Sequence, residues 1–137
     1  MGRIVAIDYG AKRVGLAVTD PLKIIATALD TQSSDQVIAY LENYVQQENV
    51  ECFVVGMPKS LDGQRTQATP LVEGFVKLLQ KKIPEIPIHL HDERFTSKMA
   101  LDAMISGGTT KKYRREKGNI DKVSAVIILQ SYMESIS

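Results

Sequence analysis

The stretch that decides the fold is residues 3–19, RIVAIDYGAKRVGLAVT. Residues 3–8 are a short apolar run that ends in Asp8, and the second run, residues 13–19, carries apolar side chains at every other position. Such alternation is typical of a β-strand, and the intervening Tyr9-Gly10-Ala11-Lys12 is typical of a turn. These residues therefore predict a β-hairpin with Asp8 at the end of its first strand.

The hairpin is followed by a regular series of elements. We expect a third strand over 24–31, a helix up to Asn49 that Ser33, Ser34 or Asp35 would cap, and a strand over 51–55 that ends at Gly56. The next element is a helix whose inner face carries Leu71, Val72, Phe75, Val76 and Leu79. It is followed by a strand over 88–90, a helix over 97–106 that Thr96 would cap, and a last helix over about 120–133. Three antiparallel strands followed by alternating helices and strands predict a three-layer α/β fold, with one mixed five-stranded sheet between helices and residues 1–137 as one domain.

Composition narrows the classes of protein. The single cysteine, Cys52, lies in an apolar run, so we expect a buried side chain and exclude a zinc site made of cysteines. The N-terminal residues do not have the length of a signal peptide or a membrane span, so we expect a cytoplasmic location and no membrane partner. Net charge is only +1, yet residues 111–117 hold five basic residues and one acidic residue. This basic segment is either a phosphate-binding surface or a solvated loop.

Three acidic residues are candidates for chemistry. Asp8 ends a strand beside Gly10, where the backbone can turn sharply and a ligand can approach, although aspartate is also common in plain turns. Glu93 follows the fifth strand next to Asp92, and the side chains of two adjacent strand residues point in opposite directions. We expect Glu93 to face the crevice at the end of the sheet and Asp92 to have a structural role, with the exchange of these roles left open. Asp121 is expected in the first turn of the last helix, where the helix dipole alone could explain it.

The residues around Asp121 on the last helix are a reason to group it with Asp8 and Glu93. Ser124, Ala125 and Ile128 share its face and are small or apolar, so this face can press closely on the sheet. Carboxylates that are brought together repel unless cations hold them, and ligand sets made only of oxygen favour Mg²⁺ or Mn²⁺. The three acids therefore predict a site for divalent cations that serves phosphodiester cleavage. His89 and His91 share a strand face, but without a third histidine we interpret them as ordinary strand residues.

Basic residues near these acids are candidates for phosphate contacts. The loop after Gly56 displays Lys59 and Arg65 around the turn pair Asp62-Gly63, although a plain structural loop would look similar. The full set of expected nucleic-acid-binding residues is Lys12, Arg13, Lys59, Arg65, Arg94, Lys111, Lys112, Arg114 and Arg115.

The motifs resemble those of the YqgF family, also called RuvX, of Holliday-junction-resolvase-like proteins with the ribonuclease H fold. The resemblance covers nearly the whole chain and rests on residues 7–20, on Val55-Gly56-Met57-Pro58 with Asp62-Gly63, on residues 92–96, and on Ile120-Asp121 leading into residues 125–130. It implies a nuclease that matures the 5′ end of small-subunit ribosomal RNA, with Asp8, Glu93 and Asp121 as its catalytic and metal-binding acids.

Other functions remain open on the residues alone. A ribosome-assembly factor that binds RNA without cleaving it would keep the fold, and a resolvase of branched DNA would differ only in its substrate and would imply a homodimer. An actin-like ATPase or kinase would also use a hairpin such as Asp8-Tyr9-Gly10 with Lys12 to grip phosphate, but it needs two such domains, and this chain has residues for one.

Overall fold

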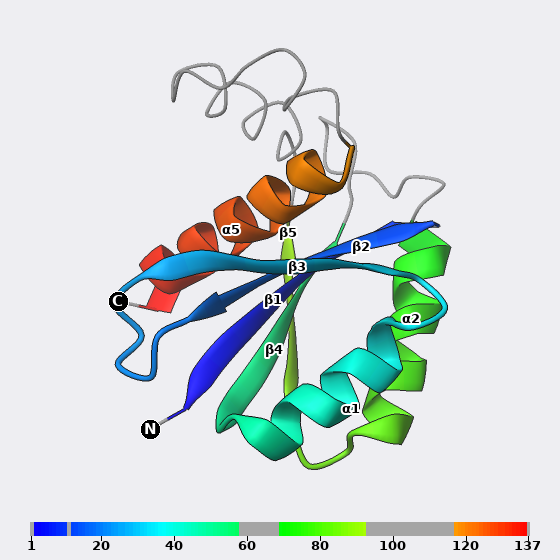
Figure 1. Cartoon of the computed structure of the whole chain (residues 1–137), viewed down its shortest axis with the longest axis horizontal. Coiled ribbons are helices and arrows are strands. Elements are labelled where there is room, and N and C mark those ends of the chain that lie inside the picture. Colours follow the sequence, from blue (N-terminus) through cyan, green and yellow to red (C-terminus); the bar gives the residue numbers. More distant parts are fainter. Residues whose placement is uncertain (1, 11, 58–68, 93–116, 137) are drawn as a thin grey trace.

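The computed structural model describes residues 2–10, 12–57, 69–92 and 117–136, although not the side chains of Asp92 and residues 117–122. The described elements, labelled in Figure 1, are β1 (Arg3–Tyr9), β2 (Arg13–Thr19), β3 (Ala26–Ser33), α1 (Val37–Gln47), β4 (Val50–Met57), α2 (Thr69–Lys82), β5 (Ile88–Asp92) and α5 (Lys117–Ile136). The expected helix over 97–106 and its cap Thr96 lie outside the described residues.

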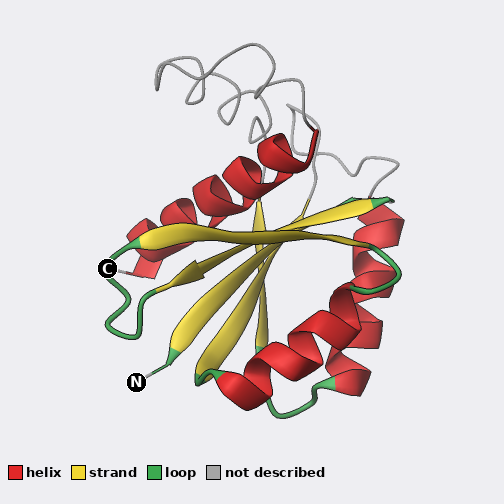
Figure 2. Cartoon of the chain, viewed as in Figure 1, coloured by secondary structure: helices red, strands yellow, loops and turns green. Residues whose placement is uncertain are grey.

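The five strands form one mixed sheet in the order β3-β2-β1-β4-β5. β1 pairs with β2, and β2 with β3, in antiparallel fashion, whereas β1 with β4 and β4 with β5 are parallel. The predicted hairpin, the mixed five-stranded sheet and the α/β class are therefore confirmed. Figure 2 shows the sheet between α5 on one side and α1 with α2 on the other.

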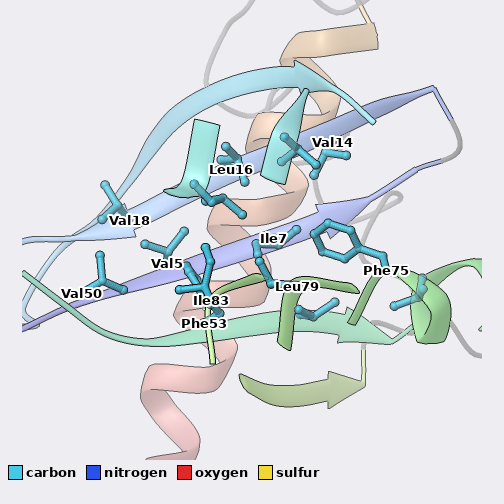
Figure 3. Close-up of a cluster of buried hydrophobic side chains, with 14 of the residues drawn as sticks. Val5, Ile7, Val14, Leu16, Val18, Val50, Phe53, Phe75, Leu79 and Ile83 are labelled. Atoms are coloured by element: carbon cyan, nitrogen blue, oxygen red, sulfur yellow. The ribbon is translucent and has the colours of Figure 1, made fainter. Parts of the chain in front are cut away.

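Alternate residues of each strand enter the two cores that these helices cover. On β1, Val5 and Ile7 pack in the core beneath α1 and α2, while Ile4 and Ala6 pack in the core beneath α5. Figure 3 shows the first core, in which side chains of β1, β2 and β4 meet Phe75 and Leu79 of α2 and Ile83 just beyond it. Full burial of one such side chain contributes roughly 1.5–3 kcal/mol to stability. Because side chains alternate along a strand, Asp8 follows Ala6 onto the α5 face.

Three predicted details of the helices are wrong. The residue that caps α1 is Gln36, and it makes no side-chain capping hydrogen bond, so none of the three residues expected to cap this helix does so. Leu71 of α2 is 52% exposed and does not belong to the inner face. The last helix begins at Lys117 rather than near Ile120, which places Asp121 beyond its first turn.

The bounds of three strands differ slightly from those that the sequence predicts. β3 spans 26–33 rather than 24–31, because the preceding residues form a separate turn in which the Asp20 carboxylate accepts hydrogen bonds from the backbone N–H groups of Ile24 and Ile25. β4 and β5 extend to Met57 and Asp92. Among the described helices, none is long and apolar enough to cross a membrane.

Candidate functional site at the end of β1

Asp8 lies on the α5 face of the sheet between two glycines. It pairs with Gly15 of β2. On its other side, Ile7 pairs with Val55, so the next residue of β4, Gly56, comes level with Asp8, and Gly56 pairs in turn with His91 of β5. Since neither glycine carries a side chain, the two neighbouring strands place no side chain directly beside Asp8 on this face of the sheet.

The turn after Asp8 is held by backbone contacts. The Gly10 N–H donates to the carbonyl oxygen of Arg13 over 2.9 Å, and the Ser34 N–H donates to the carbonyl oxygen of Lys12 over 3.1 Å. A Cβ atom at Gly10 would lie 2.7 Å from the Arg13 carbonyl oxygen, so only glycine fits there without a shift. The turn thus fixes Lys12, which is exposed, and Arg13, which is half-buried, close to Asp8 along the chain.

Tyr9 anchors the end of β1 from the opposite face. Its ring stacks on Phe75 of α2 with 4.4 Å between the ring centroids and 21° between the ring planes. Tyr9 is packed against the core beneath α1 and α2. This contact holds the strand in the register that presents Asp8 to the α5 side.

Helix α5 lies against the sheet through small and apolar side chains. Ala125, Ile128 and Leu129 are buried in the same core as Ile4 and Ala6, and Ser124 is buried beside them. The small size of Ser124 and Ala125 lets the helix approach the strands closely. The predicted inward face of this helix is therefore confirmed.

Helix α5 crosses the sheet on the face to which the alternation of β1 assigns Asp8. Near its C-terminal end, Met133 and Glu134 line a hollow together with Ile24, Ile25 and Ala26, the residues that follow β2. Figure 1 shows α5 running back from there to begin at the end of the molecule where β5 ends. Asp121 belongs to this helix, one turn before Ala125, and its side chain is not described.

The two histidines of β5 share the α5 face, as predicted, and take part in packing. The rings of His89 and His91 lie 5.9 and 6.1 Å from the Tyr132 ring, centroid to centroid, and His91 Nε2 lies 2.8 Å from Ser131 Oγ in a hydrogen bond. This agrees with their interpretation as ordinary strand residues. The partners on α5 were not foreseen, because the contact joins residues forty positions apart and no local pattern signals it.

Cys52 is buried and unpaired, as predicted. Burial raises the pKa of its thiol, and the nearby Glu51 carboxylate acts in the same direction. A thiol that stays protonated is a poor nucleophile and a poor metal ligand. Chemistry based on cysteine is therefore not a property of this site.

Several predicted site residues lie outside the described part of the chain. These are Glu93, Lys59, Arg65, Arg94, Lys111, Lys112, Arg114 and Arg115. Within the residues that the structure does describe, no group of three His, Cys, Asp or Glu side chains could hold a metal ion. The described part of the site consists of Asp8, its two flanking glycines, and Lys12 and Arg13.

Comparisons with known proteins show which family the chain resembles over its whole length. The model of the RuvX family, described as "Holliday junction resolvase", matches residues 2–135. A protein of Amoebophilus asiaticus is 51% identical over 135 residues, covering 98% of this chain and 96% of its own, and one of Parabacteroides distasonis is 50% identical with the same coverage; both are named "Putative pre-16S rRNA nuclease".

Solved structures share the fold at low sequence identity. RuvC of T. thermophilus, solved in complex with a Holliday junction substrate, has a TM-score of 0.58 at 16% identity and covers 99% of this chain and 96% of its own. The resolvase of Fowlpox virus, solved with junction DNA, has a TM-score of 0.58 at 14% identity and 98% coverage of both chains.

The sheet order and these neighbours define a ribonuclease H-like fold of the resolvase type. Within that class, the chain belongs to the RuvX family. It is a nuclease, a hydrolase that acts on phosphate esters.

One described residue of the site is of a type that binds divalent cations. The Asp8 carboxylate offers oxygen, the donor type that Mg²⁺ and Mn²⁺ prefer. On α5, the Ser124 hydroxyl is buried and has no hydrogen-bond partner among the described residues. A buried polar atom without a partner is expected where an ion or a bound water belongs.

Proposed function

We propose that the chain cleaves precursor small-subunit ribosomal RNA at phosphodiester bonds, as one nuclease domain over residues 1–137. The observation that carries the proposal is the position of Asp8 near the end of β1, between two glycines and on the face of the sheet that α5 covers. The names of relatives at 50% and 51% identity, with nearly full coverage of both chains, support this substrate. The substrate is an RNA that occurs in the cytoplasm, where we expect the protein to act.

Asp8, Glu93 and Asp121 are the residues that would hold Mg²⁺ or Mn²⁺. Bound there, the cations supply a Lewis acid for the attacked phosphate and lower the pKa of an attacking water. We keep Glu93 rather than Asp92 as the middle acid of this set, and neither side chain is described.

The basic residues would hold the RNA rather than read its sequence. Lys12 and Arg13 closely follow Asp8 in the sequence and their backbones are hydrogen-bonded, so they can bind a phosphate next to the one that is cleaved. Lys59, Arg65, Arg94 and the basic segment Lys111, Lys112, Arg114 and Arg115 would contact further phosphates. Such contacts set the position of the strand in the site and carry no base specificity.

Replacing Asp8 with asparagine tests the proposal directly. Asp8→Asn removes one negative charge without changing shape, so we expect Mn²⁺-dependent cleavage of a labelled small-subunit ribosomal RNA precursor to fall roughly 100-fold, the scale of losing one group that stabilises developing charge. Circular dichroism checks that the variant folds. The matched control, Glu85→Gln, neutralises an exposed carboxylate in the connection before β5 and should leave cleavage unchanged.

A junction-resolving activity is the second candidate, because the family model is described as a resolvase and the structural neighbours were solved with junction DNA. Paired symmetric nicks in a four-way junction, with no cleavage of the RNA precursor, would replace the RNA substrate with branched DNA. Symmetric nicking would also predict a homodimer, which light scattering would detect. Cleavage of neither substrate, with normal RNA processing in cells that carry Asp8→Asn, would make the chain a non-catalytic assembly factor.

A further inference from the structure

The most exposed large apolar side chains of the described residues are gathered at one place. Leu22, Ile24 and Ile25, in the turn between β2 and β3, are 58%, 67% and 62% exposed, and Ile136, at the end of α5, is 57% exposed. Figure 1 shows the end of α5 beside this turn. Single exposed apolar residues are ordinary, but a group of them on one surface marks a site of interaction. We call these four residues the aliphatic patch.

A hollow of about 480 Å³ gives the patch a concave shape. It lies between the turn and α5, and the residues that line it are Ile24, Ile25, Ala26, Gln130, Met133 and Glu134. Ile136 comes three positions after Met133, so the two share a side of the helix. An apolar side chain of a partner can therefore enter the hollow while others cover its rim.

The turn that carries the patch is held in one conformation by Asp20. The Asp20 carboxylate accepts hydrogen bonds from the N–H groups of Ile24 and Ile25 over 2.7 and 2.8 Å, and the Asp20 carbonyl oxygen accepts the N–H of Lys23 over 2.9 Å. Lys23 has a φ of 59°, which side chains other than glycine rarely adopt. The chain thus fixes its isoleucines in an exposed position. A surface formed in advance loses little conformational entropy when a partner binds.

The charges around the patch indicate what kind of partner it fits. Lys23 Nζ lies 2.7 Å from Glu51 Oε1 in an ion pair, and Glu134 stands at the hollow, so the rim carries both signs and no excess of bases. A nucleic acid or an anionic membrane surface would require such an excess. In a dimer about a two-fold axis, each patch meets its own copy. A rim with charges of both signs can then be matched by itself.

The apolar side chains exposed on α2 lack this property. Leu71 and Leu78 are about half exposed, and the charged residues of that helix that are fully exposed are Lys77, Lys81 and Lys82. Two copies of this face would bring like charges together, which opposes association. The α2 face therefore serves as the control surface.

We propose that the aliphatic patch joins two copies of the chain in a symmetric dimer. Four side chains from each copy are few beside the roughly 20–30 residues a side of a stable interface, so the dimer dissociates on dilution. The turn follows Thr19, at the opposite end of β2 from Gly15, the residue that pairs with Asp8. The contact thus leaves the Asp8 end of the sheet uncovered in both copies. Such a dimer does not depend on which nucleic acid is cleaved.

Sedimentation equilibrium of the full-length chain over a series of concentrations tests the dimer. The mean mass of the wild type should rise from that of one chain toward that of two, with little change at high salt because the contact is apolar. Ile24→Glu and, separately, Ile25→Glu place a charge in the patch and should each raise the dissociation constant at least tenfold, roughly the effect of losing one central contact. Circular dichroism checks that both variants fold.

Leu71→Glu is the matched control, because it adds the same charge at an exposed leucine of α2. It should leave the dissociation constant of the dimer unchanged. A wild-type chain that sediments as one chain at every concentration overturns the proposal and leaves the patch to a different protein. Association that Leu71→Glu weakens as much as the two isoleucine variants do, or that those variants leave intact, places the contact elsewhere and overturns it as well.

Discussion

Gly10 shows how a single residue shapes the site. Its N–H closes the turn on the Arg13 carbonyl oxygen, and a Cβ atom would meet that same oxygen at 2.7 Å. The obstacle is backbone, which cannot move aside as a flexible side chain can. The turn that follows Asp8 therefore depends on glycine for close approach.

From this geometry we predict opposite effects for two glycine substitutions. Gly10→Ala should lower the free energy of unfolding by about 1–3 kcal/mol, because the turn must distort. Gly74→Ala, in α2, should raise it by about 0.5–1 kcal/mol, because a Cβ there meets nothing within 4 Å and alanine is the better helix former. Urea denaturation of both variants measures the difference. A Gly10→Ala protein as stable as the wild type would show that the turn relaxes without cost.

At the scale of elements, α2 illustrates which apolar residues hold a helix to the sheet. Val72, Phe75 and Leu79 are buried at helical spacing, whereas Leu71 lies one position, about 100° of rotation, away from that stripe and is 52% exposed. Both leucines are apolar and belong to the same helix. They differ only in the side of the helix on which they stand.

We therefore predict that truncating these two leucines has unequal consequences. Leu79→Ala removes a fully buried side chain and should cost about 2–5 kcal/mol of stability. Leu71→Ala should change stability by no more than about 0.5 kcal/mol, since it alters an exposed surface. Thermal or urea unfolding followed by circular dichroism compares them. Equal losses would mean that Leu71 is covered in solution by part of the chain or by a partner.

The same helix shows where sequence patterns succeed and where they stop. The helices and strands were predictable, because the period of two residues in a strand and of about 3.6 residues in a helix arises from local geometry. Asp8 was predictable because a strand end beside glycine is also a local signal. Leu71 was misassigned because a dense apolar run contains more than one possible stripe. The start of α5 was missed because Lys117-Gly118-Asn119 favours helix weakly, and its place in the tertiary structure decides.

Contacts between distant elements could not be predicted from the sequence at all. The hydrogen bond of His91 with Ser131 and the packing of both histidines on Tyr132 join β5 to α5 only once the chain has folded. The unpaired hydroxyl of Ser124 is likewise a property of packing. In the sequence, Ser124 appears only as a small residue on the inward face of a helix.

At the scale of the whole molecule, opposite charges are separated along the chain. The net charge is only +1, yet the basic segment that contains Lys111, Lys112, Arg114 and Arg115 comes directly before α5 in the sequence. A nuclease needs both kinds of charge, because acids bind cations and bases bind the phosphates of the nucleic acid. We assign the second role to this segment.

Neutralising those four residues to glutamine should weaken RNA binding and flatten its dependence on salt. Each phosphate contact that is lost reduces the slope of log K against log salt by roughly 0.7 for a single strand, because fewer counterions are released on binding. Anisotropy of a labelled RNA over a series of salt concentrations gives the slope, with Asp8→Asn as the background to prevent cleavage. The control neutralises Lys77, Lys81 and Lys82, which are exposed on α2, and should leave the slope near the wild-type value. An unchanged slope in the first variant would show that the segment makes no phosphate contact. An equal change per removed charge in both would mean that the RNA responds only to net charge.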